Sequence, residues 1–155
     1  MKLHDILAGR AVRQISKGTS KKRLLCDMGH VAADCYGVEV DAAIQALMDR
    51  EALGPTGVGD GVALPHARLP GLDRVHGVFF RLDAPINYDA VDRKPVDLVF
   101  GLFAPEGAGV THLKALALVS RTMRERGLQA KLRANTDPQI LHTLLTEAGP
   151  ASEAA

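Results

Sequence analysis

Apolar residues recur at helical spacing in the first third of the chain. Ser20 is suited to cap the start of a helix and Gly37 to end it. Between them one apolar stripe runs through Leu24, Leu25, Met28, Val31, Ala32 and Cys35. A second helix is predicted from about Asp41 to Ala52, and the alternating residues Val12–Ser16 predict a short strand before both.

A glycine-rich stretch and three apolar runs occupy the middle of the chain. The stretch Gly54–Gly61 contains four glycines, which predicts a loop. The apolar runs at 62–64, 75–82 and 96–103 predict three strands. The last run is nearly all apolar, which is typical of a central strand covered on both faces.

Helical patterns return in the last third. Thr111 is suited to cap a long helix that runs from His112 to about Arg126, and a shorter helical piece follows at 128–133. A third helix is predicted to begin at Thr136-Asp137-Pro138, because proline suits the first turn, and to end at Gly149.

Helical segments therefore precede and follow the strand cluster. This order predicts a single-domain α/β sandwich over residues 1–149, with a small mixed sheet flanked by helices. The sheet is expected to be mixed because some connections between strands are too short for a crossover helix. Residues 150–155 are expected to form a flexible tail.

Charge and hydropathy give no support for a nucleic-acid or membrane partner. The chain has 19 basic and 18 acidic side chains, so nothing favours a nucleic acid or a membrane surface. The one dense basic run, Lys21–Arg23, is interpreted as the solvated first turn of a helix. No apolar run approaches the ~20 residues that span a bilayer, and Met1–Arg10 lacks the apolar stretch of a signal peptide. We therefore expect a cytoplasmic protein without stable membrane insertion.

Several kinds of catalytic site find no support in the sequence. There is no HExxH zinc motif, no GxSxG nucleophile elbow and no P-loop. The two cysteines form no CxxC pair and fall on a predicted helix, so we expect buried free thiols. Six histidines remain as candidates. Four of them are interpreted as ordinary exposed or hydrogen-bonded side chains: His4, His30, His76 and His142.

His66 differs from the other histidines in its surroundings. It follows the glycine-rich stretch and a short predicted strand, directly after Pro65, which fixes its own φ. Arg68 lies two residues on, so in an extended segment both side chains point to the same side. Neutral imidazole is a good nucleophile toward phosphorus, and a guanidinium binds phosphate oxygens. His66 is therefore a candidate phosphoryl acceptor.

The segment around His66 resembles a known family. Gly-Val-Gly-Asp-Gly-Val-Ala-Leu-Pro-His-Ala-Arg, residues 57–68, is similar to the active-site segment of phosphotransferase system enzyme IIA proteins of the mannitol/fructose type, most of all the nitrogen-regulatory (IIA-Ntr) branch. The likeness covers most of residues 10–147. Further matching segments are Leu47–Gly54, Ala84–Ile86, Pro95–Leu98 and Thr111–Leu113.

The resemblance implies a fold, a chemistry and a set of partners. It implies the same α/β sandwich, with His66 as the phosphohistidine and His112 as an assisting histidine that carries no phosphate. Arg50 matches an arginine close to this site. The donor would be an HPr-like phosphocarrier, charged by an enzyme I from phosphoenolpyruvate, and no metal ion or organic cofactor is expected.

The position of His112 agrees with this role. His112 falls in the first turn of a predicted helix, where backbone N–H groups are unpaired and an imidazolium is disfavoured. A neutral His112 could donate one N–H to a phosphoryl group on His66.

Three functions remain open. The first is a regulatory phosphocarrier, linked to nitrogen or general metabolism, that binds target proteins. The second is a sugar-specific enzyme IIA that donates phosphate to an enzyme IIB for fructose- or mannitol-type uptake. The third is an interaction module without phosphate exchange, against which His66, Arg68 and His112 argue. A single IIA-like domain without a fused transporter module favours the first.

The sequence also departs from the family pattern. Asp60 stands where the nitrogen-regulatory members often have asparagine, and its charge would disfavour a phosphohistidine if it pointed inward. Arg68 stands where many relatives have lysine. Apolar residues near His66, namely Val58, Val62 and Leu69, are candidates for the rim of a docking face, although Val62 fits ordinary packing equally well.

Overall fold

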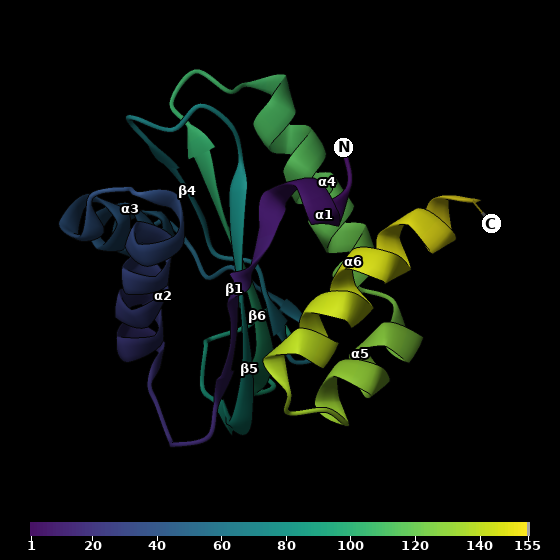
Figure 1. Ribbon diagram of the computed structural model, residues 1–155. Helices are drawn as coiled ribbons and strands as arrows, with labels where there is room; N and C mark the ends of the chain where they lie inside the picture. Colours follow the sequence, from purple (N-terminus) through teal and green to yellow (C-terminus); the bar gives the residue numbers. More distant parts are fainter. Residues whose placement is uncertain (155) are drawn as a thin grey trace.

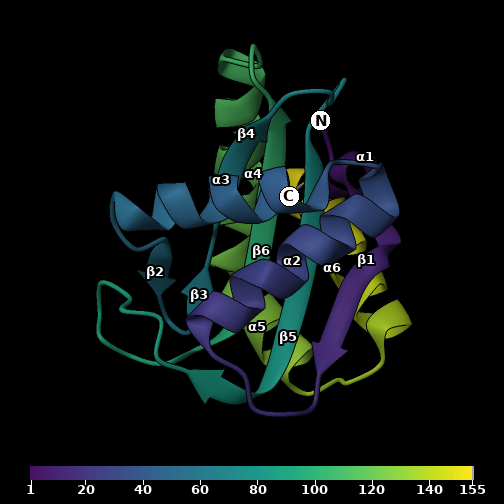
Figure 2. The ribbon, with the colours of Figure 1, turned by 90° about the vertical axis from the view of Figure 1, so that its left-hand side faces the viewer.

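The fold is a β-sheet between two layers of helices (Figure 1). The computed structural model describes the backbone of residues 1–154 and the side chains as far as Glu147. Two helices cover one face, α2 (Lys21–Tyr36) and α3 (Val40–Ala52). The other face carries α1 (Leu3–Ile6), α4 (Val110–Met123), α5 (Arg126–Arg133) and α6 (Pro138–Ala154). Figure 2 looks onto the first face, where α2 and α3 cross the strands. The predicted α/β sandwich is confirmed.

The sheet is mixed, as predicted. Within residues 1–154 it has six strands in the order β1-β5-β6-β3-β2, with β4 also paired to β6. β1 runs parallel to β5, and β3 and β4 run parallel to β6, whereas the β5–β6 and β2–β3 pairs are antiparallel. The strands are β1 (Leu7–Ile15), β2 (Gly57–Gly59), β3 (Val62–Ala63), β4 (His66–Leu69), β5 (His76–Ile86) and β6 (Val96–Pro105).

β6 is the central strand that its apolar run predicted. All its residues except Asp97 and Pro105 are buried. Phe100 of β6 packs edge-to-face on Phe79 of β5, with ring centroids 6.2 Å apart. Among residues 1–154, no helix combines the length and the apolar composition that crossing a bilayer requires.

The ends of the first long helix follow the sequence prediction. Arg23 N donates to Ser20 Oγ at 3.2 Å, and Gly37 ends α2 in the left-handed conformation, with φ at 73°. The free cysteines are half-buried, not buried as predicted. The reason is that Cys26 lies beside the apolar stripe of α2 and that Cys35 lies in the last turn of this helix.

Two predicted strand limits were wrong. β1 begins at Leu7, well before the predicted start at Val12. The start was missed because the pairing of β1 with β5 shifts register between these two residues, and the segment lacks the regular alternation that marks a strand. The stretch Gly54–Gly61, predicted as a loop, contains the three residues of β2, which pair with β3.

Two predicted helix ends were also wrong. Gly109, at φ 50°, precedes the first residue of α4, so Thr111 lies inside the first turn and does not cap it. α6 continues through Gly149 to Ala154, since one glycine costs a helix only about 1 kcal/mol and does not forbid it. A flexible tail at 150–155 stays a prediction.

An interruption beside β6 positions His66. Ala63 of β3 pairs with Val99 of β6, and His66 of β4 pairs with Leu102. Between them the backbone passes through Leu64 and Pro65 outside the ladder. Proline can donate no backbone hydrogen bond, but its carbonyl accepts one from Leu102 N at 2.9 Å. His66 therefore opens a new strand.

Candidate active site

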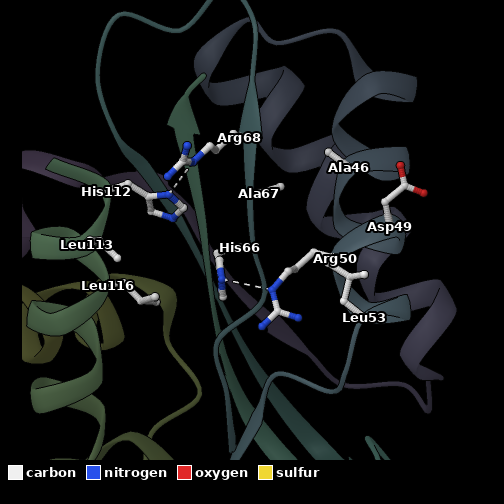
Figure 3. A pocket seen from close by; sticks show the side chains of 10 residues that line it. All are labelled: Ala46, Asp49, Arg50, Leu53, His66, Ala67, Arg68, His112, Leu113 and Leu116. Carbon is white, nitrogen blue, oxygen red and sulfur yellow. Dashed lines mark hydrogen bonds between the residues drawn. The ribbon is translucent and has the colours of Figure 1, made fainter. Parts of the chain in front are cut away.

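A groove of about 630 Å³ lies between α3 and α4, over β4 (Figure 3). All four residues that the sequence singled out line it: His66, Arg68, His112 and Arg50. The rest of the lining is apolar apart from one carboxylate, and consists of Ala46, Asp49, Leu53, Ala67, Leu113 and Leu116. Segments more than forty residues apart in the sequence thus meet at one place.

Strand alternation brings His66 and Arg68 to the same side of β4. His66 is half-buried and Arg68 is exposed, whereas Ala67 and Leu69 are buried. This is the arrangement expected for an extended segment. The sequence predicted His66 just after the end of a strand over 62–64, whereas the structure begins a separate strand, β4, at His66.

The hydrogen bonds of His66 fix its tautomer. Nδ1 lies 2.9 Å from the carbonyl oxygen of Leu64, which can only accept, so Nδ1 carries the proton. Arg50 Nε donates to Nε2 at 3.4 Å, so Nε2 is unprotonated. The lone pair of Nε2, which accepts this long hydrogen bond from Arg50, is therefore the nucleophile of this ring (Figure 3).

Arg50 is anchored as well as charged. It comes from the last turn of α3, and its Nη1 donates to the carbonyl oxygen of Gly54 at 3.0 Å. That carbonyl lies just beyond the helix end, where a cation is favoured. The anchoring contact holds the guanidinium over the groove.

His112 is the buried member of the group. Only 7% of it is exposed, and Arg68 Nε donates to its Nδ1 at 3.3 Å. In the neutral ring the proton then lies on Nε2, and this N–H has no partner among the described residues. Burial lowers the pKa of His112, and the neighbouring His66 and the charge of Arg68 lower it further. Burial, the largest cause, favours the neutral ring.

The two imidazole rings lie next to each other in an edge-to-face arrangement. Their centroids lie 5.6 Å apart, with the ring planes at 71°. One ring offers an unprotonated nitrogen and the other an unpartnered N–H, and a guanidinium accompanies each. Such a set of donors and cations suits a tetrahedral anion bonded to Nε2 of His66.

Residues 6–148 match a protein family described as "Phosphoenolpyruvate-dependent sugar phosphotransferase system, EIIA 2". The chain belongs to this family.

Three known proteins illustrate the similarity of this chain in sequence and in structure. A nitrogen regulatory protein of Bradyrhizobium diazoefficiens is 45% identical over 94% of this chain and 95% of its own. The crystal structure of the nitrogen regulatory protein IIA-Ntr of Neisseria meningitidis is 31% identical, with a TM-score of 0.83 over 92% of this chain and 97% of its own. Enzyme IIA-Mtl of Escherichia coli, solved in complex with phosphorylated enzyme IIB-Mtl, is 20% identical, with a TM-score of 0.74 over 92% and 99%, and shows the shared fold.

Asp60 does not line the groove of this EIIA 2 protein. Its backbone is held at φ 56° by Asp92, whose carboxylate accepts from Asp60 N, and by Arg133, which donates to Asp60 O. The side chain lines a separate hollow with Lys94 and Arg126. The sequence left its direction open, and the structure turns it away from His66.

The rim of the groove differs from the prediction. Val62 and Leu69 are buried in the core, and Val58 is exposed but does not line the groove. The exposed apolar residues of the lining are Leu53, 84% exposed, and Leu113, 64% exposed. Sequence reasoning missed both, although Leu53 directly follows a helix end and Leu113 adjoins His112.

The other four histidines lie outside the groove. His4 and His30 are exposed. His142 Nε2 lies 2.9 Å from the carbonyl oxygen of Leu7. The ring of His76 stacks on the ring of Tyr36, with the ring centroids 4.1 Å apart. These contacts agree with the interpretation of them as ordinary side chains. The described residues include no group of three or more His, Cys, Asp or Glu side chains suited to a metal ion.

Proposed function

We propose that this protein accepts a phosphoryl group on Nε2 of His66 from an HPr-like phosphocarrier and acts as a regulatory protein linked to nitrogen or general metabolism. The observation that carries the proposal is the state of the His66 ring. Its Nδ1 is bound to the Leu64 carbonyl, and its Nε2 lone pair meets a groove with two guanidinium groups. The protein would act in the cytoplasm, where such a donor acts.

The transfer needs no separate base. The Nε2 lone pair attacks phosphorus, the donor's N–P bond breaks, and the electron pair returns to the donor's nitrogen. Positive charge develops on the His66 ring, and the Leu64 carbonyl, 2.9 Å from Nδ1, stabilises it. The proton on Nδ1 stays where it is throughout the step.

Arg50 and His112 bind the phosphoryl oxygens, and Arg68 orients His112. Arg50 now donates to Nε2 at 3.4 Å, a long contact that the new N–P bond replaces, and its guanidinium is then free to donate to phosphoryl oxygen. His112 Nε2–H, which has no partner among the described residues, supplies a neutral donor. Arg68 holds His112 in the tautomer that donates.

The regulatory role is supported by the relatives. A protein named nitrogen regulatory protein is alike over nearly the full length of both chains, at 45% identity. A regulatory target that docks on the groove would meet a neutral imidazole before phosphorylation and a dianion after it. Because a desolvated dianion is costly without a partner, such a target would discriminate between the two states.

An enzyme IIB is the second candidate acceptor. The observation that favours it is the fold shared with enzyme IIA-Mtl, which has been solved in complex with phosphorylated enzyme IIB-Mtl. In that case His66 would pass its phosphoryl group onward to a transporter subunit.

Reconstituted transfer tests both proposals. The protein is incubated with enzyme I, an HPr-like protein and labelled phosphoenolpyruvate, with and without a fructose- or mannitol-type enzyme IIB. We expect the parent to take label and His66→Ala to take none. Retention of label in the presence of IIB supports the regulatory role, and loss of label to IIB supports the sugar-specific role. Undiminished labelling of His66→Ala would refute the assignment.

A further inference from the structure

A buried ion pair lies beside the groove, next to Arg50 in the sequence. Lys21 Nζ lies 2.9 Å from Glu51 Oε2, and the Glu51 side chain is only 6% exposed. Lys21 Nζ also donates to the carbonyl oxygen of Tyr88 at 3.1 Å and lies over its ring. The basic run at Lys21 was interpreted as a solvated first turn, and for Lys21 this was wrong. The ion pair joins the start of α2 to the end of α3.

Glu51 also accepts hydrogen bonds from Thr56, in the segment that follows α3, and from Tyr88. Thr56 N donates to Oε1 and Oε2, both at 3.3 Å, and Thr56 Oγ1 donates to Oε1. Tyr88 OH donates to Oε1 at 3.1 Å. Burial and the charge of Glu51 raise the pKa of Tyr88, which therefore stays a donor. Thr56 is itself buried, with 5% exposed.

The segment Gly54–Thr56 is connected to both ring nitrogens of His66 by hydrogen bonds that pass through Leu64 and Arg50. The carbonyl oxygen of Thr56 accepts from Leu64 N at 2.9 Å, and the carbonyl oxygen of Leu64 binds Nδ1 of His66. The carbonyl oxygen of Gly54 anchors Arg50, which donates to Nε2. The position of this segment therefore fixes both hydrogen bonds that select the His66 tautomer.

We propose that Glu51 is a positioning residue for His66: by binding the backbone and hydroxyl of Thr56 it holds the Gly54–Thr56 segment, and through it the tautomer with an unprotonated Nε2. The inference rests on the proposed phosphoryl transfer for its role in the reaction. Lys21 and Tyr88 orient the carboxylate. Glu51 makes no contact with the reacting nitrogen and acts only through the segment.

The test is the tautomer of His66 in the unphosphorylated full-length protein, read from the ¹⁵N shifts of its ring nitrogens, together with the rate of phosphoryl transfer. Glu51→Gln removes the charge and one acceptor. We expect a mixture of His66 tautomers and a rate lowered on the order of 10- to 100-fold, as for other groups that orient a histidine through its second nitrogen. Thr56→Val, which removes only the hydroxyl, carries the test if Glu51→Gln does not fold. Thr56→Ser keeps both donors and should recover most of the rate lost in Thr56→Val.

Arg81→Met is the matched control. Arg81 binds Gln14 of β1 and the carbonyl groups of Leu132 and Arg133 at the end of α5, so its loss weakens the fold away from the groove. It should leave the His66 tautomer and the transfer rate as in the parent. Folded Glu51→Gln or Thr56→Val protein with the parent's tautomer and rate would overturn the inference. A parent that takes no phosphate would instead refute the proposed function, while the tautomer would still report on Glu51.

Discussion

The two imidazoles of the groove differ in what their nitrogens offer. His66 presents an unprotonated Nε2, whereas His112 presents an N–H on Nε2 that has no partner among the described residues. Buried polar atoms are nearly always hydrogen-bonded in native proteins, so an unpartnered donor beside a nucleophile calls for a ligand that completes it. A phosphoryl oxygen on His66 would do so.

Removal of this donor should slow the reaction without unfolding the protein. We expect His112→Ala to lower the rate of phosphoryl transfer ~10²–10³-fold, the usual effect of losing one oriented donor to developing charge. His112→Gln keeps an N–H and should retain part of the rate. Stopped-flow transfer from the phosphorylated donor measures both. Parent rates in both variants would show that His112 does not bind the phosphoryl group.

The lowered pKa of His112 has a consequence for stability. Its pKa is lowered from 6.5 chiefly by burial, and the pKa of His76 is lowered from 6.5 chiefly for the same reason. As pH falls below about 6.5, the unfolded chain binds protons on these rings before the folded protein does. The free energy of unfolding should therefore decrease from pH 6.5 downward, until the lower folded-state pKa values are reached.

Urea unfolding at pH 7.5 and 5.5 measures this decrease. In His112→Gln and His76→Gln the difference between the two pH values should be smaller than in the parent, because each variant lacks one of the titrating rings. A difference that neither substitution reduces would show that other groups cause it.

At the scale of elements, the start of α4 determines where His112 lies. Gly109 precedes this helix at φ 50° and ψ −112°, a conformation that side chains rarely adopt. We expect Gly109→Ala to lower the free energy of unfolding by about 1–3 kcal/mol, because the strained backbone must persist or the turn must rearrange. Chemical denaturation measures this cost.

Gly107→Ala is the control for this prediction. Gly107 lies in the same turn, its φ is not in the positive region, and an added Cβ would meet open space. Its effect should stay within about 0.5 kcal/mol. Equal losses in the two variants would mean that the backbone of Gly109 is not the cause.

How far the sequence predicted each element depended on how much of the element's pattern is local. α2, α3 and β6 carry long apolar patterns, and the structure confirms them. The short strands β2 and β4 were not predicted, because each has only three or four residues. β2 lies within the glycine-rich stretch, and β4 is defined by pairing with β6, far away in the sequence. The start of α4 was missed because it depends on the backbone of Gly109, not on a capping side chain.

The same limit applies to the candidate site. Strand alternation was enough to place Arg68 beside His66, since the two are sequence neighbours. Arg50 reaches the groove from α3, and only the family resemblance pointed to it. The roles of Lys21 and Glu51 could not be predicted, because their ion pair joins the ends of two helices that meet only in the folded protein.

At the scale of the whole molecule, the groove opens between the two helical layers. α3 belongs to one layer and α4 to the other, and each contributes an exposed leucine to the rim, Leu53 just past the end of α3 and Leu113 in α4. In the proposed transfer, the protein that delivers a phosphoryl group to His66 approaches this groove. We therefore expect the apolar rim to belong to the docking surface of the donor.

Substitution of the rim should weaken docking and spare the fold. We expect Leu53→Ser with Leu113→Ser to raise the KM for the phosphorylated donor by about tenfold, the effect of losing roughly 1.4 kcal/mol of apolar burial. The melting temperature should not change, because both side chains are exposed. Ile140→Ser, which removes a 44% exposed side chain of α6, is the control and should leave KM unchanged. An equal rise in KM for this control would argue against a local docking surface.

In the proposed function the phosphoryl group resides on Nε2 of His66, the nitrogen that faces the groove, and not on Nδ1, which lies against the carbonyl oxygen of Leu64. Heteronuclear NMR of the ¹⁵N-labelled phosphoprotein, held at alkaline pH to protect the N–P bond, measures this directly through ¹⁵N–³¹P coupling. We expect one phosphorus signal, coupled to Nε2 of His66. Coupling to Nδ1 of His66, or to a nitrogen of His112, would contradict it.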